Sequence, residues 1–308
     1  MFPCDLPLYF AGLPFTKRQI GSKLPWLLGA GEIRRVVGDV YVDTRVPDSP
    51  ALRAAAAAKA IPAGAVACGE LAAWVHGIDT TALGRSSSAR GRSSAGRSPR
   101  REPPADADAV RLEFVREGAD VVDLGDLRVS SPVATGVQLA MQLPRPFALS
   151  AVDAMLRAGT VDRWALRAAS AAYDGQPGIR QAREILRYAD RRAASPGESW
   201  LRLRLIDAGF GRPEAQYRVA GARREYRIDL AYPEPVDDGQ QLGLEYDSDA
   251  WHSRDRDQQR DDLRRQELEE LGWHLLSVRR PDLWGSYPAL ELAVGSFLGR
   301  HPRLPRRW

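Results

Sequence analysis

The chain has 308 residues, a length that allows a sizeable core and favours two domains over one. Hydrophobic residues make up 44% and charged residues 27%, a composition typical of a soluble globular protein. No apolar run approaches the length of a membrane span, and the first ten residues lack the basic head and apolar stretch of a signal peptide. Two cysteines exclude a disulfide framework, so we expect a cytoplasmic protein.

Positive charge is concentrated in one low-complexity segment. Residues 84–104 contain six arginines and one glutamate, a net charge of +5, so the rest of the chain carries −1 of the total +4. A tract of Arg, Ser and Gly predicts a disordered insertion. Such a tract can hold nucleic acid through its phosphates, and a flexible insertion between two strands explains it equally well.

Two short helices followed by a hairpin are predicted near the N-terminus. Thr16 and Gln19 have the spacing of a capping box, and a second helix that holds Leu24, Leu27 and Leu28 is predicted to end at Gly29 or Gly31. The run G-E-I-R-R-V-V-G-D-V-Y-V-D then predicts two strands joined near Gly38. This is the order of a winged helix-turn-helix. Its candidate contacts to DNA phosphates are Lys17, Arg18, Arg34 and Arg35. The alternative is a small packing module with solvated charges.

Helical and strand-like stretches continue to about residue 194. Strand-like runs are V-R-L-E-F-V and D-L-R-V-S-S. Helices are predicted over residues 50–61, 69–78, 132–143, 148–158, 161–173 and 179–194. His76 lies beside Trp74 at the end of the second of these helices. We interpret it as a packed, hydrogen-bonded histidine and not as a catalytic one.

Acidic residues lie inside two strand-like runs of the C-terminal third, R-I-D-L-A-Y and L-G-L-E-Y-D. A carboxylate such as Asp229 or Glu245 is costly in an apolar strand unless something compensates it, and a divalent cation is the usual compensation. Side chains on a strand have a period of two, so Glu245 and Asp247 share a face. Glu198 falls in the first turn of a helix beginning near Ser195, where the helix dipole alone also favours an acid.

A charged helix and a strand complete the pattern. The helix is expected over residues 255–271 with three apolar anchors, and W-H-L-L-S-V-R-R is the strand. The expected anchors are Leu263, Leu268 and Leu271. Trp251 and Trp273 are expected in the core. From Pro281 onward we expect a tail with one more short helix.

Residues 195–280 resemble the Vsr-like branch of the PD-(D/E)XK nuclease superfamily. The pattern is a helix glutamate, a strand aspartate, E-x-D with a histidine soon after, and then D-x-x-R-x-x-x-L-x-x-x-G-W. The matching positions are Glu198, Asp229, Glu245, Asp247, His252, Asp261, Arg264, Leu268, Gly272 and Trp273. The N-terminal portion is similar to the winged-helix region of AbiEi-type antitoxins, as are residues 72–77 and 129–143.

The nuclease resemblance implies cleavage of DNA with the help of a metal ion. Asp229 and Glu245 would hold Mg²⁺ or Mn²⁺ through carboxylate oxygens. Glu198 and Asp247 would orient the attacking water or hold a second ion. His252 would act as general base or acid, and the alternative for it is a packing histidine.

Two positions depart from the family pattern. Ser248 replaces a glycine, and Asp247 replaces the motif lysine that ordinarily orients water and steadies developing charge. Either His252 or Arg264 would have to take over, or the site is crippled, although the wider family also carries aspartate there. Asp261 and Arg264, three residues apart on a helix, would support the site or form a surface pair.

We therefore predict a mixed α/β protein in four segments. These are a winged-helix-like module at 1–48, an α/β region at 49–145, a helical connector at 146–194, and at 195–300 a restriction-endonuclease-like mixed sheet flanked by helices. The predicted function is a metal-dependent DNA endonuclease guided by the N-terminal module. The alternatives are a non-catalytic DNA-binding regulator of AbiEi antitoxin type and a plain interaction protein. The predicted partner is DNA, without a membrane, and the oligomeric state stays open.

Overall fold

The computed structural model describes residues 12–78, 80, 110–118, 120–221, 224–236, 238–247 and 255–308, without the side chains of 255–261. The predictions for residues 84–104, Ser248, Trp251 and His252, and for the side chain of Asp261, lie outside this description. No helix among the described residues is long and apolar enough to cross a membrane.

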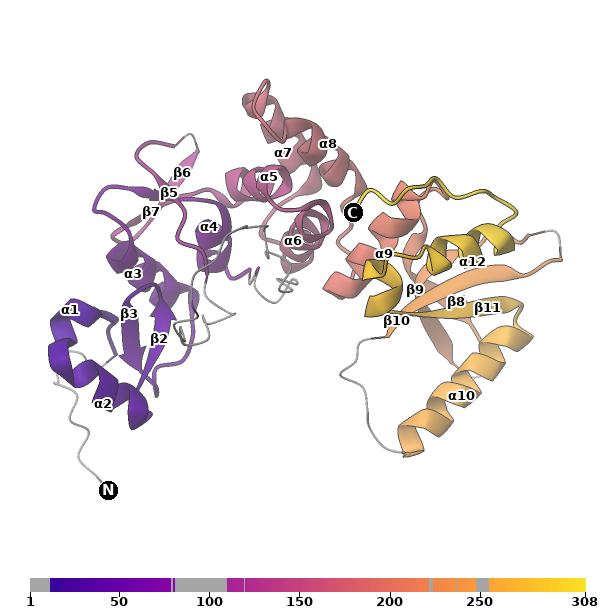
Figure 1. Ribbon diagram of the computed structural model, residues 1–308, viewed down its shortest axis with the longest axis horizontal. Helices are drawn as coiled ribbons and strands as arrows, with labels where there is room; N and C mark the ends of the chain where they lie inside the picture. Colours follow the sequence, from indigo (N-terminus) through magenta and orange to yellow (C-terminus); the bar gives the residue numbers. More distant parts are fainter. Residues whose placement is uncertain are drawn as a thin grey trace, which may run out of the picture. The chain divides into compact units, whose positions relative to one another are not determined.

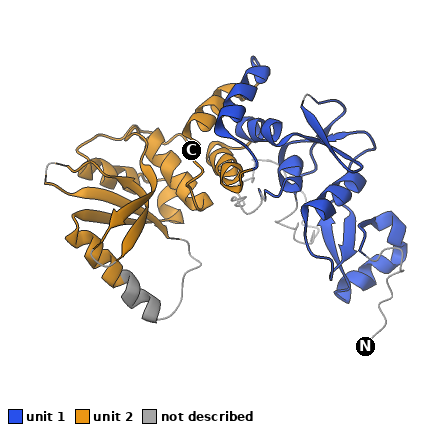
Figure 2. Cartoon of the chain, turned by 180° about the vertical axis from the view of Figure 1, so that it is seen from behind, with its two compact units in different colours: residues 1–142, 160–176 blue, residues 143–159, 177–308 orange. Residues whose placement is uncertain are grey.

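Contacts divide the chain into two compact units (Figure 2). The first contains residues 1–142 and 160–176, and the second contains residues 143–159 and 177–308. The four segments proposed from the sequence stay a prediction.

The first unit begins with a winged-helix-like arrangement (Figure 1). Its elements are β1 (Phe15–Thr16), α1 (Lys17–Ile20), the 3-10 turn Gly21–Lys23, α2 (Leu24–Gly29), β2 (Ile33–Val37) and β3 (Val40–Asp43). The strands form an antiparallel sheet in the order β1-β3-β2. The predicted capping box is confirmed, because the backbone N–H of Thr16 donates to Oε1 of Gln19 at 2.8 Å. Phe15 and Leu27 are fully buried in the small core beneath the helices.

The rest of the first unit packs helices on a mixed four-stranded sheet. The strands are β4 (Val66–Ala67), β5 (Phe114–Val115), β6 (Val121–Leu124) and β7 (Leu127–Ser130), in the order β5-β4-β7-β6. The helices are α3 (Pro50–Ala60), α4 (Gly69–Val75), α5 (Pro132–Gln142), α7 (Arg163–Ala169) and the 3-10 turn Ser170–Tyr173. The Nε2–H of His76 donates to the Ser130 carbonyl at 2.8 Å, and burial lowers the pKa of this histidine. The interpretation of His76 as packed and hydrogen-bonded is confirmed.

The second unit is a mixed sheet flanked by helices on both faces. Its strands are β8 (Glu214–Ala220), β9 (Glu225–Tyr232), β10 (Gln241–Asp247) and β11 (Trp273–Arg279), in the order β11-β10-β9-β8. In this sheet β10 pairs with β11 in parallel, whereas the β10–β9 and β9–β8 pairs are antiparallel. The helices are α6 (Arg145–Ala158), α8 (Ile179–Tyr188), α9 (Pro196–Asp207), α10 (Asp255–Glu270), α11 (Arg280–Trp284) and α12 (Ala289–Phe297). Core residues of α9, α11 and α12 cover one face, and Leu268 of α10 packs on the other (Figure 1).

Three expectations for the second unit were wrong. The helix expected to reach residue 194 ends at Tyr188, because the N–H of Asp190 turns inward and donates to Oδ1 of Asp153 at 2.7 Å. Of the three expected anchors of α10, only Leu268 is buried, whereas Leu263 and Leu271 are exposed. The C-terminal tail forms two helices where one was expected.

The segment that follows α12 packs along α9. The ring of Trp308 covers the guanidinium of Arg204 at 3.6 Å, and Arg204 donates to the Trp308 carbonyl at 2.7 Å. Arg306 forms an ion pair with the buried carboxylate of Glu291 at 2.6 Å. With the sheet on one side and this segment on another, α9 is buried around most of its circumference, arginines included.

Candidate functional site

Glu198 is held at the N-terminal end of α9 by capping contacts. Ser195 is the N-cap, and its hydroxyl oxygen accepts the backbone N–H of Glu198 at 3.2 Å. The Glu198 carboxylate reaches back and accepts the N–H of Ala194 at 2.9 Å. The Glu198 side chain is therefore buried and held in one orientation. Its Oε2 atom accepts hydrogen bonds both from the residue before the N-cap and from Gln216 of the sheet.

Gln216 connects Glu198 to Asp229. Its Nε2 donates to Oε2 of Glu198 at 2.8 Å and to Oδ1 of Asp229 at 3.2 Å. The other oxygen of Asp229 accepts the backbone N–H of Tyr246 at 3.0 Å. One residue from each of α9, β8 and β9 thus meets beside the backbone of β10.

The two β-strands that carry Gln216 and Asp229 change face at this pair. Ala215 and Leu230 pack in the core cluster beneath α9, whereas Tyr217 and Ile228 pack in the cluster beneath α10. In a regular strand, residues two apart share a face. Gln216 breaks the alternation because its φ is +53°, a left-handed conformation that non-glycine residues rarely adopt.

The acids influence one another electrostatically. Burial, together with the nearby charges of Glu198 and Glu245, raises the pKa of Asp229 to about 6, against the hydrogen bonds from Tyr246 and Gln216 that lower it. Two acidic groups, Glu198 and Glu245, therefore lie near enough to oppose ionisation of Asp229.

Glu245 is held by a base from the next helix. Arg264 of α10 makes a two-pronged contact with its carboxylate, one prong being 2.9 Å from Nη1 to Oε2, and also donates to the Arg227 carbonyl at 2.7 Å. Both side chains of the pair are mostly buried. Asp247, two residues further along β10, is exposed at the end of the strand.

Gly197 lets the first turn of α9 approach β10. A methyl group added at its Cα would lie 2.0 Å from the ring of Tyr246. That ring also packs edge-on against Trp200, with ring centroids 6.4 Å apart. The sequence P-G-E at the start of α9 therefore combines a helix-initiating proline, a contact that only glycine permits, and the acid.

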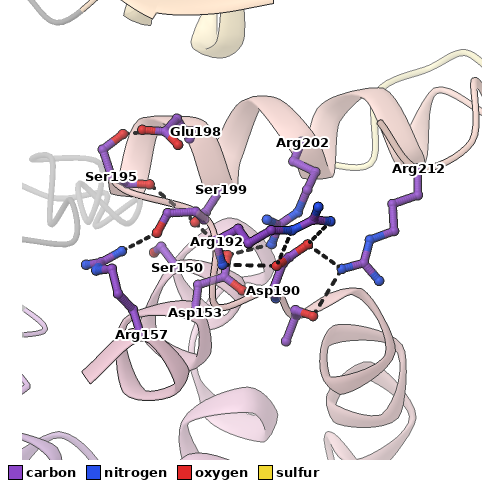
Figure 3. A network of polar contacts seen from close by, with 12 residues as sticks. Ser150, Asp153, Arg157, Asp190, Arg192, Ser195, Glu198, Ser199, Arg202 and Arg212 are labelled. Atoms are coloured by element: carbon purple, nitrogen blue, oxygen red, sulfur yellow. Dashed lines mark hydrogen bonds and ion pairs between the residues drawn. The ribbon is translucent and has the colours of Figure 1, made fainter. Parts of the chain in front are cut away.

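A polar network beneath α9 fixes its first half (Figure 3). Asp153 of α6 accepts from the Ser199 hydroxyl and from Nη2 of Arg202, both at 2.6 Å. Asp190 contacts Arg192 at 3.1 Å and Arg212 at 2.9 Å. Residues from α6, from the turn after α8 and from α9 are therefore connected by hydrogen bonds within about one helical turn of Glu198.

The candidate DNA-binding residues lie on the winged-helix-like module. Lys17 and Arg18 are exposed on α1. Arg34 and Arg35 also bind the protein itself, since Arg34 donates to the Val46 carbonyl at 2.9 Å and Arg35 to the Gly38 carbonyl at 2.5 Å.

The donor set has the chemistry that hard divalent cations prefer. Glu198, Asp229 and Glu245 offer carboxylate oxygens, and their mutual repulsion is what such a cation relieves. Within the described ranges, however, no three His, Cys, Asp or Glu side chains gather as a metal-binding group. The amide of Gln216 binds both Glu198 and Asp229. The third acid, Glu245, forms an ion pair with Arg264.

Comparison with known sequences gives matches to two family models. Residues 198–291 match REase_MTES_1575, a restriction-endonuclease-like domain, and residues 65–188 match the AbiEi antitoxin C-terminal domain. Two proteins of Mycobacterium tuberculosis, named uncharacterized protein MT2308 in strain CDC 1551 / Oshkosh and uncharacterized protein Rv2248 in strain H37Rv, are each 36% identical over 186 residues. The alignment covers 60% of this chain and 67% of each relative. The chain belongs to their family. No solved structure matches it.

The family matches bear out the predicted fusion of an antitoxin-like part with a nuclease-like part. All of the candidate acids lie inside the restriction-endonuclease-like match. Gln216 and Gly197 were missed from the sequence. The place of Gly197 between Pro196 and Glu198 could have indicated that it has a role in the site. A glutamine in a strand-like run gives no such indication.

Proposed function

We propose that this protein is a metal-dependent DNA endonuclease whose winged-helix-like module delivers it to DNA. The observation that carries the proposal is the meeting of Glu198 and Asp229 at Gln216, with Glu245 close enough to raise the pKa of Asp229. It occurs in a domain that matches a restriction-endonuclease-like family.

Each acid has a separate role in this proposal. Asp229 and Glu245 would hold Mg²⁺ or Mn²⁺. When bound, the ion polarises the scissile phosphate and lowers the pKa of a coordinated water. Glu198 is fixed by Ser195 and the Ala194 N–H, and it orients the water. Asp247 assists Glu198, and His252 exchanges a proton as general base or acid.

Arg264 supplies the positive charge that the motif lysine would otherwise bring. In the metal-free protein its guanidinium neutralises Glu245. If Glu245 held the ion, the planar guanidinium would be available to a phosphate, which it would bind with two parallel hydrogen bonds. Asp261, on the same helix, is proposed as a supporting residue of the site.

Cleavage of supercoiled plasmid tests the proposal. Wild-type protein is expected to nick the plasmid in Mg²⁺ or Mn²⁺ and not in EDTA, and Asp229→Ala and Glu245→Ala to lower the rate by at least about 100-fold. Glu225→Ala, at the exposed start of the same strand as Asp229, is the control that keeps wild-type activity. Nicking that survives in both site variants contradicts the proposal.

The ion pair between Arg264 and Glu245 is also compatible with a second function, that of a non-catalytic DNA-binding regulator. Arg264 bound to Glu245, and aspartate in place of the lysine, also suit a nuclease fold that has become a scaffold in an AbiEi-type regulator. A regulator predicts a DNA gel shift that survives EDTA, without any cleavage. The gel shift is best tested with the double variant Lys17→Ala and Arg18→Ala, because Arg34 and Arg35 also bind backbone carbonyls.

A further inference from the structure

Gln216 lies where two like charges meet. Its single amide nitrogen carries two N–H groups, and it contacts one oxygen of Glu198 and one oxygen of Asp229. Two carboxylates that share a neighbour in this way repel each other, and the donor between them offsets the repulsion.

We propose that Gln216 is a positioning residue that stands in for the cation in the metal-free protein. Its amide holds Glu198 and Asp229 together, and an incoming divalent ion competes with it for the Asp229 oxygen. The competition rests on the proposed function, because that function supplies the ion.

The backbone of Gln216 agrees with a role of this kind. Its φ of +53° is a strained conformation for glutamine, and strain of this type persists where the surroundings over-determine it. Here the conformation coincides with the change of face between Ala215 and Tyr217. The side chain thereby reaches Glu198 on α9 while the strand continues toward the other core cluster.

Competition between Gln216 and the divalent ion predicts a change in metal affinity that a purely structural role does not predict. A contact present only in the metal-free state stabilises that state and weakens metal binding by the same factor. Removal of the amide therefore lowers the stability of the metal-free protein and tightens the binding of the metal. A residue that only supports the fold gives lower stability together with unchanged or weaker metal binding.

The test uses Gln216→Leu, which keeps much of the side-chain volume without the donor. Mn²⁺ affinity is measured from the electron paramagnetic resonance signal of free Mn²⁺, and stability from urea unfolding in EDTA. Gln216→Leu is expected to unfold at lower urea and to bind Mn²⁺ roughly tenfold more tightly than wild type. Unchanged or weaker Mn²⁺ binding overturns the competition.

Gln181→Leu is the matched control. Gln181 is a half-buried glutamine of the same unit whose amide donates to the Leu143 carbonyl at 2.9 Å. Its loss is expected to lower stability and to leave Mn²⁺ affinity as in wild type.

A double-variant cycle in EDTA separates this proposal from the proposed function. If the repulsion between Glu198 and Asp229 is what Gln216 offsets, Gln216→Leu costs little stability in a Glu198→Gln background. A cost that is as large in that background as in wild type overturns the role of Gln216. Absence of Mn²⁺ binding by wild-type protein would instead overturn the proposed function and the competition, while this cycle still decides whether Gln216 offsets the repulsion.

Discussion

Gln216 holds a backbone conformation that suits glycine better than any residue with a side chain. At φ +53°, a Cβ atom crowds the backbone, which costs about 1 to 2 kcal/mol. Gln216→Gly and Gln216→Ala both remove the amide, and only glycine removes the strain. We expect Gln216→Gly to be about 1 kcal/mol more stable than Gln216→Ala in urea unfolding, the reverse of the order in an ordinary strand. Greater stability of the alanine variant would contradict the left-handed assignment.

Asp229 makes stability depend on pH in a calculable direction. Its carboxyl has a pKa of about 6 in the folded protein, against an ordinary value of 3.8. The folded state therefore retains a proton that the unfolded chain has lost, so this group lowers stability as pH rises from about 4 to 6. Asp229→Asn removes the penalty.

The matching measurement is thermal unfolding in EDTA at pH 4 and pH 7.5. Relative to wild type, Asp229→Asn is expected to gain about 1 to 2 kcal/mol at the higher pH, an amount reduced by the partial exposure of the group. An equal difference between the two proteins at both pH values would show that the pKa of Asp229 is not raised.

At the residue scale, the sequence pointed to the acids but not to what holds them. Asp229 and Glu245 stand out because charge is unusual inside apolar strands. Gln216 does not stand out, since neither its type nor its neighbours indicate a positive φ. The contact of Arg264 with Glu245 joins residues 19 apart across two elements, and only the fold brings them together.

Helix α9 is buried on nearly every side, and an ion pair between two buried side chains connects it to α6. The side chains of Arg202 and Asp153 are 0% and 1% exposed. Removal of one partner from such a pair leaves the other charged and buried, which costs about 3 to 5 kcal/mol. Asp153→Ala is expected to lose that much in urea unfolding.

The control for Asp153→Ala is Glu225→Ala. Glu225 pairs with Arg218 at 3.1 Å, but both side chains are more than half exposed, so its loss should cost less than about 1 kcal/mol. Similar losses of unfolding free energy for the two variants would mean that the buried pair beneath α9 stabilises the protein no more than an exposed pair does.

Gly197 sets the distance between α9 and β10. Gly197→Ala places a methyl group against the ring of Tyr246, so the first turn of the helix has to move and carries Glu198 with it. We expect a loss of about 1 to 3 kcal/mol in stability and weaker Mn²⁺ binding. Metal binding as tight as that of wild type, measured in the same titration, would show that the position of Glu198 does not matter to the ion.

Element boundaries followed the sequence where local chemistry decided them. The start of a helix near Ser195 and the capping box at Thr16 were readable, because both depend on neighbouring residues. The end of α8 at Tyr188 was not, because it depends on Asp153, 37 residues from Asp190. The same holds for α10, where an ion pair to β10 and a single buried leucine, Leu268, replace the expected leucine stripe.

At the scale of the whole molecule, the order of parts was predictable. A hairpin after two short helices, a helical middle and an acid-bearing sheet each have their own periodicity, and the family matches at 65–188 and 198–291 agree with the order of an antitoxin-like part followed by a nuclease-like part. Whether the acids form a working ion site was not predictable, because it depends on the competing contacts of Gln216 and Arg264.

The most direct test of the account is stabilisation by Mn²⁺ in calorimetry, since it requires no knowledge of the DNA substrate. The unfolding temperature of wild-type protein and of Glu225→Ala is expected to rise when Mn²⁺ replaces EDTA. Asp229→Ala and Glu245→Ala are expected to show no rise. A wild-type protein indifferent to Mn²⁺, or site variants that are stabilised as much as wild type, would contradict the claim that these acids form a metal site.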